Sequence, residues 1–196
     1  MKAHIAATVR SCFAALRLVR SVRRCLPRQA LLTLIRALAV SKVDYCCSVM
    51  AGISSHLLDR LQSVLNAAAR LIFSARRSVH IIPLLHDLHW LRVPERIQFR
   101  LCVLAFRCLH GTAPTYPAES LQRTTALEGR RHLRSADILL LAVPPTERST
   151  LGDCLFPAAA AKSWNRLPAS IRNASSLATF RRHLRNHLFR SSYYPN

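Results

Sequence analysis

The stretch LLDRLQSVLNAAARLI, residues 57–72, decides the fold. Its apolar side chains recur at intervals of three and four residues, which places them on one stripe of an α-helix. These side chains are Leu57, Leu58, Leu61, Val64, Leu65, Ala68, Leu71 and Ile72. Ser54 or Ser55 stands where an N-cap is needed, and the helix is expected to end in the basic pair Arg76 and Arg77. The stretch therefore predicts an amphipathic helix with one face in a core.

Two further helices are predicted before this one. In residues 4–26 apolar side chains again recur at helical spacing, while Arg10, Arg17 and Arg24 repeat every seven residues on the opposite side. Pro27 ends this cationic helix, because proline interrupts the hydrogen-bond ladder and suits the start of a new helix. A longer and more buried helix is expected over residues 29–49, ending near Gly52.

A fourth helix is predicted over residues 93–110. Pro94 and Glu95 suit a first helical turn, and Gly111 suits the residue after the last one. Most of its side chains are apolar, so the helix is expected to be largely buried with one narrow basic stripe. That stripe spans an arc of about 40° and contains Arg96, Arg100 and Arg107.

The last third of the sequence is less regular. Prolines, Gly129 and a basic run predict an irregular connection over residues 112–134. Two short segments, 138–143 and 149–156, flank Pro144 and Pro145 and predict a two-stranded hairpin. Helices follow at 158–164 and 176–189, and the outer face of the last helix carries arginines and no acid.

These elements predict a mainly α protein with three parts. A helical bundle is expected over residues 1–111, a basic connection over 112–136, and a small α+β segment over 137–196 in which a β-hairpin precedes C-terminal helices. The length of 196 residues is enough for one domain or two small ones with a sizeable core.

Composition excludes several classes of protein. Twenty-nine lysines and arginines oppose nine acids, a net charge of +20, yet 51% of the residues are hydrophobic, so we expect a folded basic protein rather than a disordered tail. Four glycines without a glycine-rich run exclude phosphate loops. No apolar stretch approaches the roughly 20 residues of a transmembrane helix. We also expect no secretory signal, and seven cysteines without framework spacing indicate a reducing compartment.

The sequence gives little support for catalysis or metal binding. Two-metal chemistry needs paired carboxylates, and the nine acids contain no adjacent pair, so Asp44 beside Tyr45 is expected to pair with a neighbouring arginine. Cysteines 46, 47, 102, 108 and 154 lack zinc spacing and are expected to pack in the core. His183 and His187 lie one turn apart without a third ligand, and His86 and His89 are no stronger candidates. We therefore expect that the chain is not an enzyme and that it binds neither a metal ion nor a cofactor.

The arginines favour nucleic acid as the partner. All but three basic residues are arginine, the side chain that grips phosphate with two hydrogen bonds and stacks on bases. The alternatives are a compositional bias of the genome, or solvated faces without a ligand. The predicted contacts are Arg17, Arg20, Arg24, Arg76, Arg77, Arg96, Arg100, Arg107, Arg130, Arg131, Arg134, Arg181, Arg182 and Arg185.

An ordered set of motifs resembles one family. The motifs are SKVDYC at 41–46, AGI at 51–53, LLDRLQ at 57–62, NAAARL at 66–71, HIIP at 80–83, LHWLRV at 88–93, RI at 96–97, LHGTAP at 109–114, LGD at 151–153, WNRLP at 164–168 and the closing helix at 175–189. In this order they resemble the region after the polymerase core in reverse transcriptases of non-LTR, LINE-type retrotransposons.

The resemblance implies a thumb-like helical bundle and a C-terminal segment that hold template and primer beside a separate palm domain. The palm with its catalytic aspartates would lie before Met1, so the chain is expected to be the tail of such a polymerase, in the nucleus or in a cytoplasmic ribonucleoprotein. The alternative is a cationic helical interaction or membrane-surface protein. Residues 1–43 contain no acid, as in a mitochondrial targeting helix.

Overall fold

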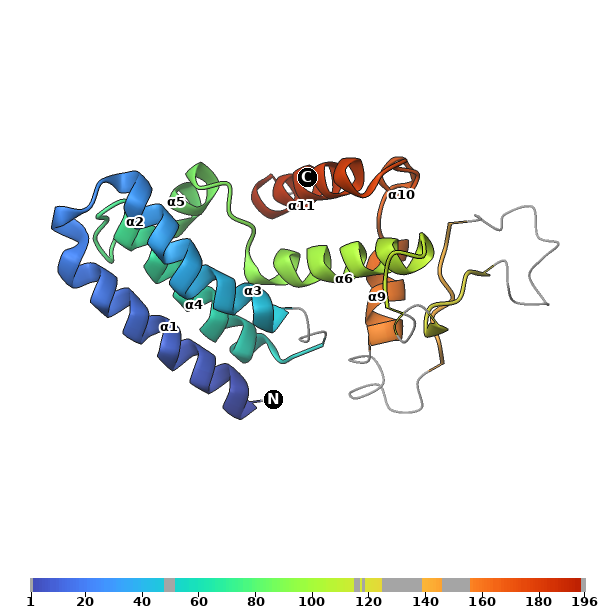
Figure 1. The fold of residues 1–196 in the computed structure, drawn as a ribbon, viewed down its shortest axis with the longest axis horizontal. Helices are drawn as coiled ribbons and strands as arrows, with labels where there is room; N and C mark the ends of the chain where they lie inside the picture. Colours follow the sequence, from blue (N-terminus) through green and yellow to red (C-terminus); the bar gives the residue numbers. More distant parts are fainter. Residues whose placement is uncertain are drawn as a thin grey trace. The chain divides into compact units, whose positions relative to one another are not determined.

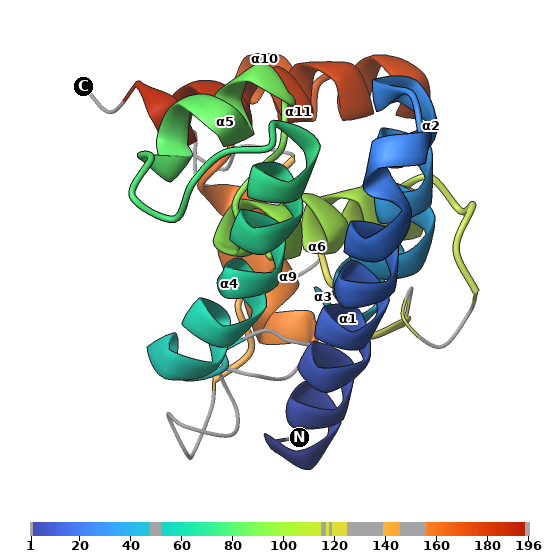
Figure 2. The ribbon, with the colours of Figure 1, turned by 90° about the vertical axis from the view of Figure 1, so that its left-hand side faces the viewer.

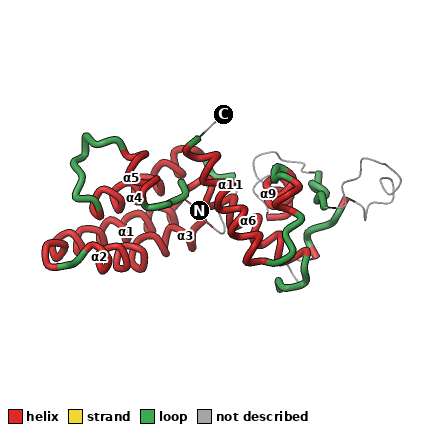
Figure 3. The backbone as a smooth tube through the Cα atoms, turned by 90° about the horizontal axis from the view of Figure 1, so that it is seen from above, coloured by secondary structure: helices red, strands yellow, loops and turns green. Residues whose placement is uncertain are grey.

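The computed structural model describes residues 2–47, 52–114, 117, 119–124, 139–145 and 156–194. It divides into two compact units: residues 1–49, 53–96 and 189–196 form the first, and residues 50–52 and 97–188 form the second. The described residues form helices and loops without a strand (Figure 3), so the predicted mainly α class is confirmed. None of these helices is long and apolar enough to cross a bilayer.

The first unit is built on α1, Lys2–Val22, and α4, Ser55–Ile72. Between them in the chain come the 3-10 turn η1 (Arg23–Cys25), α2 (Arg28–Ile35), the π-helical turn η2 (Arg36–Val40) and α3 (Ser41–Cys47). These run back alongside α1, and α4 packs beside both (Figures 1 and 2). The predicted helix over 29–49 is thus present up to Cys47 as α2, η2 and α3, with a π turn in its middle, and its last two residues lie outside the described residues.

Burial follows the apolar spacing of the sequence. The core face of α1 consists of Ile5, Val9, Cys12, Leu16 and Val19. The core face of α4 contains seven of the eight predicted apolar residues, with Leu58 partly exposed. Leu61 and Leu65 are fully buried. Helices with such stripes are stable only when the stripe is covered, so α1 and α4 hold each other in place.

The first unit also contains α5, Ile81–Asp87, and the start of α6, Val93–Leu109. The last residues of α11, Leu177–Tyr193, belong to it as well. Tyr193 Oη donates a hydrogen bond of 2.6 Å to the carbonyl of Trp90, and His86 Nε2 lies 2.9 Å from Tyr194 Oη. The sequence did not predict α5.

The second unit is organised by aromatic packing. Phe180 of α11 stacks on Phe106 of α6 at 4.5 Å between ring centroids and lies 5.6 Å from Trp164 of α9, Phe156–Asn165. All three side chains are buried. The short helix α10, Ala169–Arg172, joins α9 to α11 and was not predicted. Gly111 ends α6 as predicted: its φ is +66°, and Thr112 N donates to Arg107 O at 2.9 Å.

The predicted two-stranded hairpin is wrong for its first strand, of which the structure describes residues 139–143: they form no named strand. Leu141 makes an isolated antiparallel bridge with Arg123 and belongs to no named strand. On one edge of this segment the side chain of Asn165 accepts from Leu141 N at 2.9 Å and donates to Leu141 O at 2.8 Å. On the other edge Thr124 N donates to Leu140 O at 3.0 Å and Ala142 N donates to Gln122 O at 2.8 Å, so the backbone groups that a hairpin partner would need are already bonded. Most of the expected partner strand, residues 149–155, lies outside the described residues, as does most of the basic connection.

The predicted domain boundaries at 111 and 136 stay predictions. The division into two units falls inside α6, between Arg96 and Ile97. Position 136 lies outside the described residues.

Candidate nucleic-acid interface

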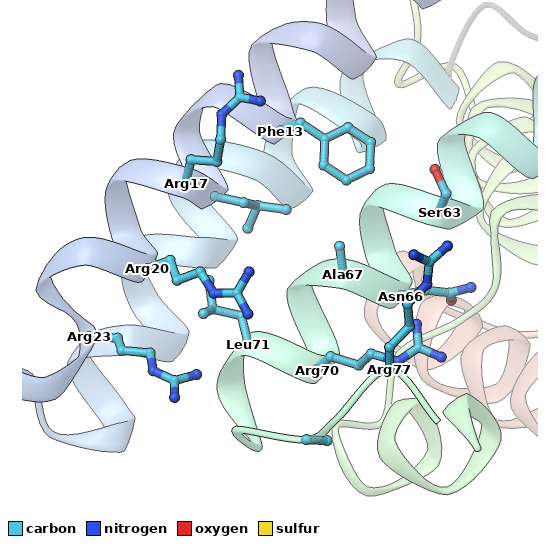
Figure 4. Close-up of a pocket in the computed structure, with 12 residues that line it drawn as sticks. Phe13, Arg17, Arg20, Arg23, Ser63, Asn66, Ala67, Arg70, Leu71 and Arg77 are labelled. Atoms are coloured by element: carbon cyan, nitrogen blue, oxygen red, sulfur yellow. The ribbon is translucent and has the colours of Figure 1, made fainter. Parts of the chain in front are cut away.

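Arginines on and directly after two helices of the first unit line one hollow, which we call the arginine cleft. It has a volume of about 500 Å³ and lies between α1 and α4 (Figure 4). Five arginines and none of the nine acids are among its described lining residues. The lining consists of Phe13, Leu16, Arg17, Arg20, Arg23, Ser63, Asn66, Ala67, Arg70, Leu71, Ala75 and Arg77.

The α1 wall supplies Arg17, Arg20 and Arg23. Arg17 and Arg20 are exposed and three residues apart, so they neighbour each other on the helix surface. Figure 4 shows these three arginines one after another along this wall. Arg23 belongs to η1 and is partly buried. The buried face of α1 packs against α4, and Arg17 and Arg20 lie at the edge of that face, so the packing holds them beside α4.

The α4 wall mixes small, polar and basic side chains. Ser63, Asn66, Ala67 and Arg70 follow each other at helical spacing along one edge of the helix. Asn66 Oδ1 accepts from Gln62 Nε2 at 2.9 Å, and Gln62 Oε1 accepts from the backbone N–H of Val93 at 2.9 Å. These two hydrogen bonds orient the polar edge of α4.

Arg70 is held at the base of this wall. It is partly buried, and its Nη2 donates to the carbonyl of Val79 at 3.4 Å. Its Nε is buried without a hydrogen-bond partner in the described part of the chain. A buried donor without an acceptor is costly, so the position of Arg70 is not explained by hydrogen bonds within the described chain alone.

The end of α4 brings Arg77 to the same cleft. Ser74 has a φ of +52°, and Ala75 N donates to Arg70 O at 2.9 Å, which turns the chain sharply after Ile72. The helix was predicted to end at the pair Arg76 and Arg77, and it ends earlier because of this left-handed turn. Arg77 then lines the cleft, whereas Arg76 is exposed and does not.

The structure thus gathers Arg17, Arg20 and Arg77 of the predicted contacts. Arg24 is exposed outside the cleft. Sequence reasoning missed Arg23 and Arg70. The spacing 63, 66, 67 and 70 along one edge of the predicted helix was a usable signal for Arg70, whereas the 3-10 turn that positions Arg23 had none.

The three predicted arginines of α6 have different surroundings. Arg96 forms an ion pair with Asp44 at 2.5 Å and donates from Nε to Leu91 O at 2.8 Å, which confirms that Asp44 pairs with a neighbouring arginine. Arg100 is exposed. Arg107 is exposed too, and both Nε and Nη2 donate to Thr112 O. Arg96 is therefore engaged within the fold.

Arg181, Arg182 and Arg185 are exposed on α11, as expected for the face opposite Phe180, Leu184 and Leu188. Arg130, Arg131 and Arg134 lie outside the described residues.

Thiols and imidazoles offer no alternative site in the described chain. Cys12, Cys47 and Cys102 are buried, and burial raises the pKa of Cys102 to about 12, so its thiol is neutral at physiological pH. Cys108 is partly buried, and burial raises its pKa as well. Within the described residues no three potential metal ligands converge, and this includes His86, His89, His183 and His187.

Chemically, the arginine cleft is suited to oxyanions. Guanidinium groups on two walls donate paired hydrogen bonds to phosphate oxygens, and a concave surface strengthens their summed field. No family model, curated protein or solved structure matches the chain.

Proposed function

We propose that the chain is a non-catalytic nucleic-acid-binding module that grips backbone phosphates through arginines, with the arginine cleft as its main contact. The observation that carries this proposal is that five arginines, without an acid among the described lining residues, line one hollow. Repulsion among these cations favours a polyanionic ligand that neutralises them.

The resemblance to the thumb and C-terminal region of LINE-type reverse transcriptases supports the same proposal. Under it, the first unit acts as a thumb-like bundle and a separate palm domain supplies catalysis.

The second candidate, a membrane-surface or targeting helix, has less support. A helix of that kind needs its apolar face free, and in α1 that face is buried in the core of the first unit. Leu18 and Val22 are exposed large apolar side chains of α1, which is too small a surface for stable membrane binding.

The test is the salt dependence of binding to a fluorescent duplex, measured by anisotropy from about 50 to about 300 mM NaCl. The double variant Arg17→Gln/Arg20→Gln should flatten the log–log slope by about 1.8, because each lost phosphate contact removes about 0.9. The matched control is Arg36→Gln/Arg166→Gln, which removes the same charge at exposed positions outside the cleft. Equal effects of the two double variants would show that net charge, not the cleft, drives binding.

A further inference from the structure

The arginine cleft contains an aromatic ring that phosphate binding does not require. Phe13 is partly buried, and Figure 4 shows its ring pointing from α1 toward the space between the two helices. Leu16, Ala67 and Leu71 add further apolar lining beside the guanidinium groups. A surface that binds only phosphates needs neither a ring nor an apolar lining.

Phe13 and Arg17 also line a second hollow. This open hollow on α1 has a volume of about 700 Å³ and includes Arg10. The two shared side chains therefore stand between the hollows, with arginines on both sides of the ring. One ring with arginines on both sides matches one base and the phosphates that flank it in a nucleic-acid strand.

We propose that the arginine cleft takes an unpaired nucleotide of a single strand, with its base against Phe13 and the flanking phosphates on Arg17 and Arg20. This inference rests on the proposed function and adds the class of nucleic acid to it.

Duplex fits the arrangement less well. In a duplex the faces of the bases are covered by their stacked neighbours, so a ring inside a hollow reaches only edges or backbone. An unpaired base exposes both faces, and a cleft walled by two helices lets guanidinium groups approach one strand from two sides. The ring and the walls together therefore select an unpaired nucleotide.

The polar edge of α4 fits a base of any kind. Ser63 Oγ donates to Arg60 O, and its oxygen retains acceptor capacity. Asn66 uses Oδ1 toward Gln62, and its amide nitrogen carries two further donors. One donor and one acceptor group on the wall opposite the ring suit base edges in general, so we expect little dependence on base sequence.

The experiment compares three fluorescent probes of about 12 nucleotides: an oligothymidine strand, a strand of the same length with abasic sugars, and a blunt duplex. The variant is Phe13→Leu, which keeps an apolar side chain and removes the ring. The matched control is Phe99→Leu, a partly buried phenylalanine of α6 outside the cleft. Anisotropy gives the dissociation constants at two salt concentrations.

Phe13→Leu should weaken binding to oligothymidine by about 5-fold or more, the effect of losing one stacked base. Its binding to the abasic strand and to the duplex should stay within about 2-fold of the wild type, as should all three affinities of Phe99→Leu. A Phe13→Leu loss that is equal on the three probes, or no loss, would overturn the single-strand inference and leave phosphate binding intact. If Arg17→Gln/Arg20→Gln also binds every probe as the wild type does, the proposed function itself fails.

A measurement on the wild type keeps the inference testable if Phe13→Leu does not fold. Electrostatics alone favours duplex, because its charge density and its salt slope per contact are both higher. Wild-type protein should nevertheless bind oligothymidine at least about 5-fold more tightly than the abasic strand at high salt. Equal affinity for these two strands would exclude a base in the cleft.

Discussion

Tyr193 joins the last turn of α11 to the segment before α6 in the first unit. Its hydroxyl donates to Trp90 O at 2.6 Å, and its ring lies 4.8 Å from that of Phe189. Burial, the largest influence, raises the pKa of Tyr193 to about 12, while the nearby Arg92 opposes the increase. The neutral phenol is therefore the form that the folded protein stabilises.

Tyr193→Phe should lower the free energy of unfolding at pH 7 by about 0.5 to 1.5 kcal/mol, because the Trp90 carbonyl loses its donor. The unfolded tyrosine loses its proton near pH 10 and the folded one near pH 12, so wild-type stability falls between these values. The variant has no hydroxyl to titrate and lacks this loss. The difference in the free energy of unfolding between wild type and Tyr193→Phe should therefore shrink from pH 10 to pH 12. Urea denaturation at several pH values measures it. A difference that is constant with pH would mean that the hydroxyl titrates normally.

The cysteines allow a second test with single residues. Cys25 is exposed, whereas Cys102 is buried and has a raised pKa, so of these two thiols Cys25 is the one that a reagent reaches in the native state. At pH 8, alkylation followed by mass spectrometry should modify Cys25 at least about tenfold faster than Cys102. In denaturant the two rates should converge. Fast native labelling of Cys102 would show that this face of α6 is open.

At the scale of elements, the end of α4 depends on a strained serine. Ser74 adopts the left-handed conformation that glycine favours, and the turn that it makes brings Arg77 to the cleft. Ser74→Gly should raise the free energy of unfolding by about 0.5 to 1 kcal/mol, because glycine carries no Cβ penalty there. Chemical denaturation measures the gain. A destabilised Ser74→Gly protein would indicate that the serine side chain contributes more than its backbone costs.

Among the substitutions considered, the largest loss of stability is expected in the buried stripe of α4. Leu61→Ala should cost about 2 to 5 kcal/mol, since the side chain is fully buried and its removal leaves a cavity. Leu18→Ala is the control, because Leu18 is 72% exposed on α1 and its loss should change stability by no more than about 0.5 kcal/mol. Equal denaturation midpoints for Leu61→Ala and wild type would show that the stripe on α4 does not face a core.

Helix length explains what the sequence predicted of the fold. α4 has 18 residues, so its apolar stripe repeats often enough to be recognised, and the same holds for α1 and α6. The prediction missed α5, which has seven residues or just under two turns, and α10, which has four residues or about one turn. The hairpin failed for another reason: Asn165 bonds the backbone of Leu141 on one edge, and Gln122 and Thr124 bond its neighbours on the other, although all three are distant in sequence. A local pattern carries no information about such a contact.

The candidate site was predictable to the same extent. Arg17 and Arg20 follow from the exposed side of a regular helix, and both line the cleft. Arg96 lies on an equally regular stripe but is paired with Asp44, a residue 52 positions earlier that only the fold brings close. Charge spacing along a helix therefore identifies surface arginines and leaves their partners undetermined.

At the scale of the whole molecule, the charge of +20 is spread over several basic surfaces. The exposed outer face of α11 carries Arg181, Arg182 and Arg185, so the arginine cleft is one basic surface among others. Two arrangements are then distinguishable: a general cationic coat, in which every arginine contributes equally, or a focused site, in which the cleft dominates. The salt dependence of binding separates them.

A contact area of about 5 to 8 phosphates gives a log–log slope of about −4.5 to −7 on duplex. If the cleft dominates, Arg17→Gln/Arg20→Gln should flatten this slope by about 1.8, and Arg181→Gln/Arg182→Gln/Arg185→Gln by less than 1.8 despite its third lost charge. A cationic coat predicts the opposite order, with the larger change in the triple variant. Both variants should keep wild-type denaturation midpoints, because Arg17, Arg20, Arg181, Arg182 and Arg185 are exposed and lie off the buried stripes. A slope near zero in the wild type would contradict both arrangements, since no phosphate contact forms without releasing counterions.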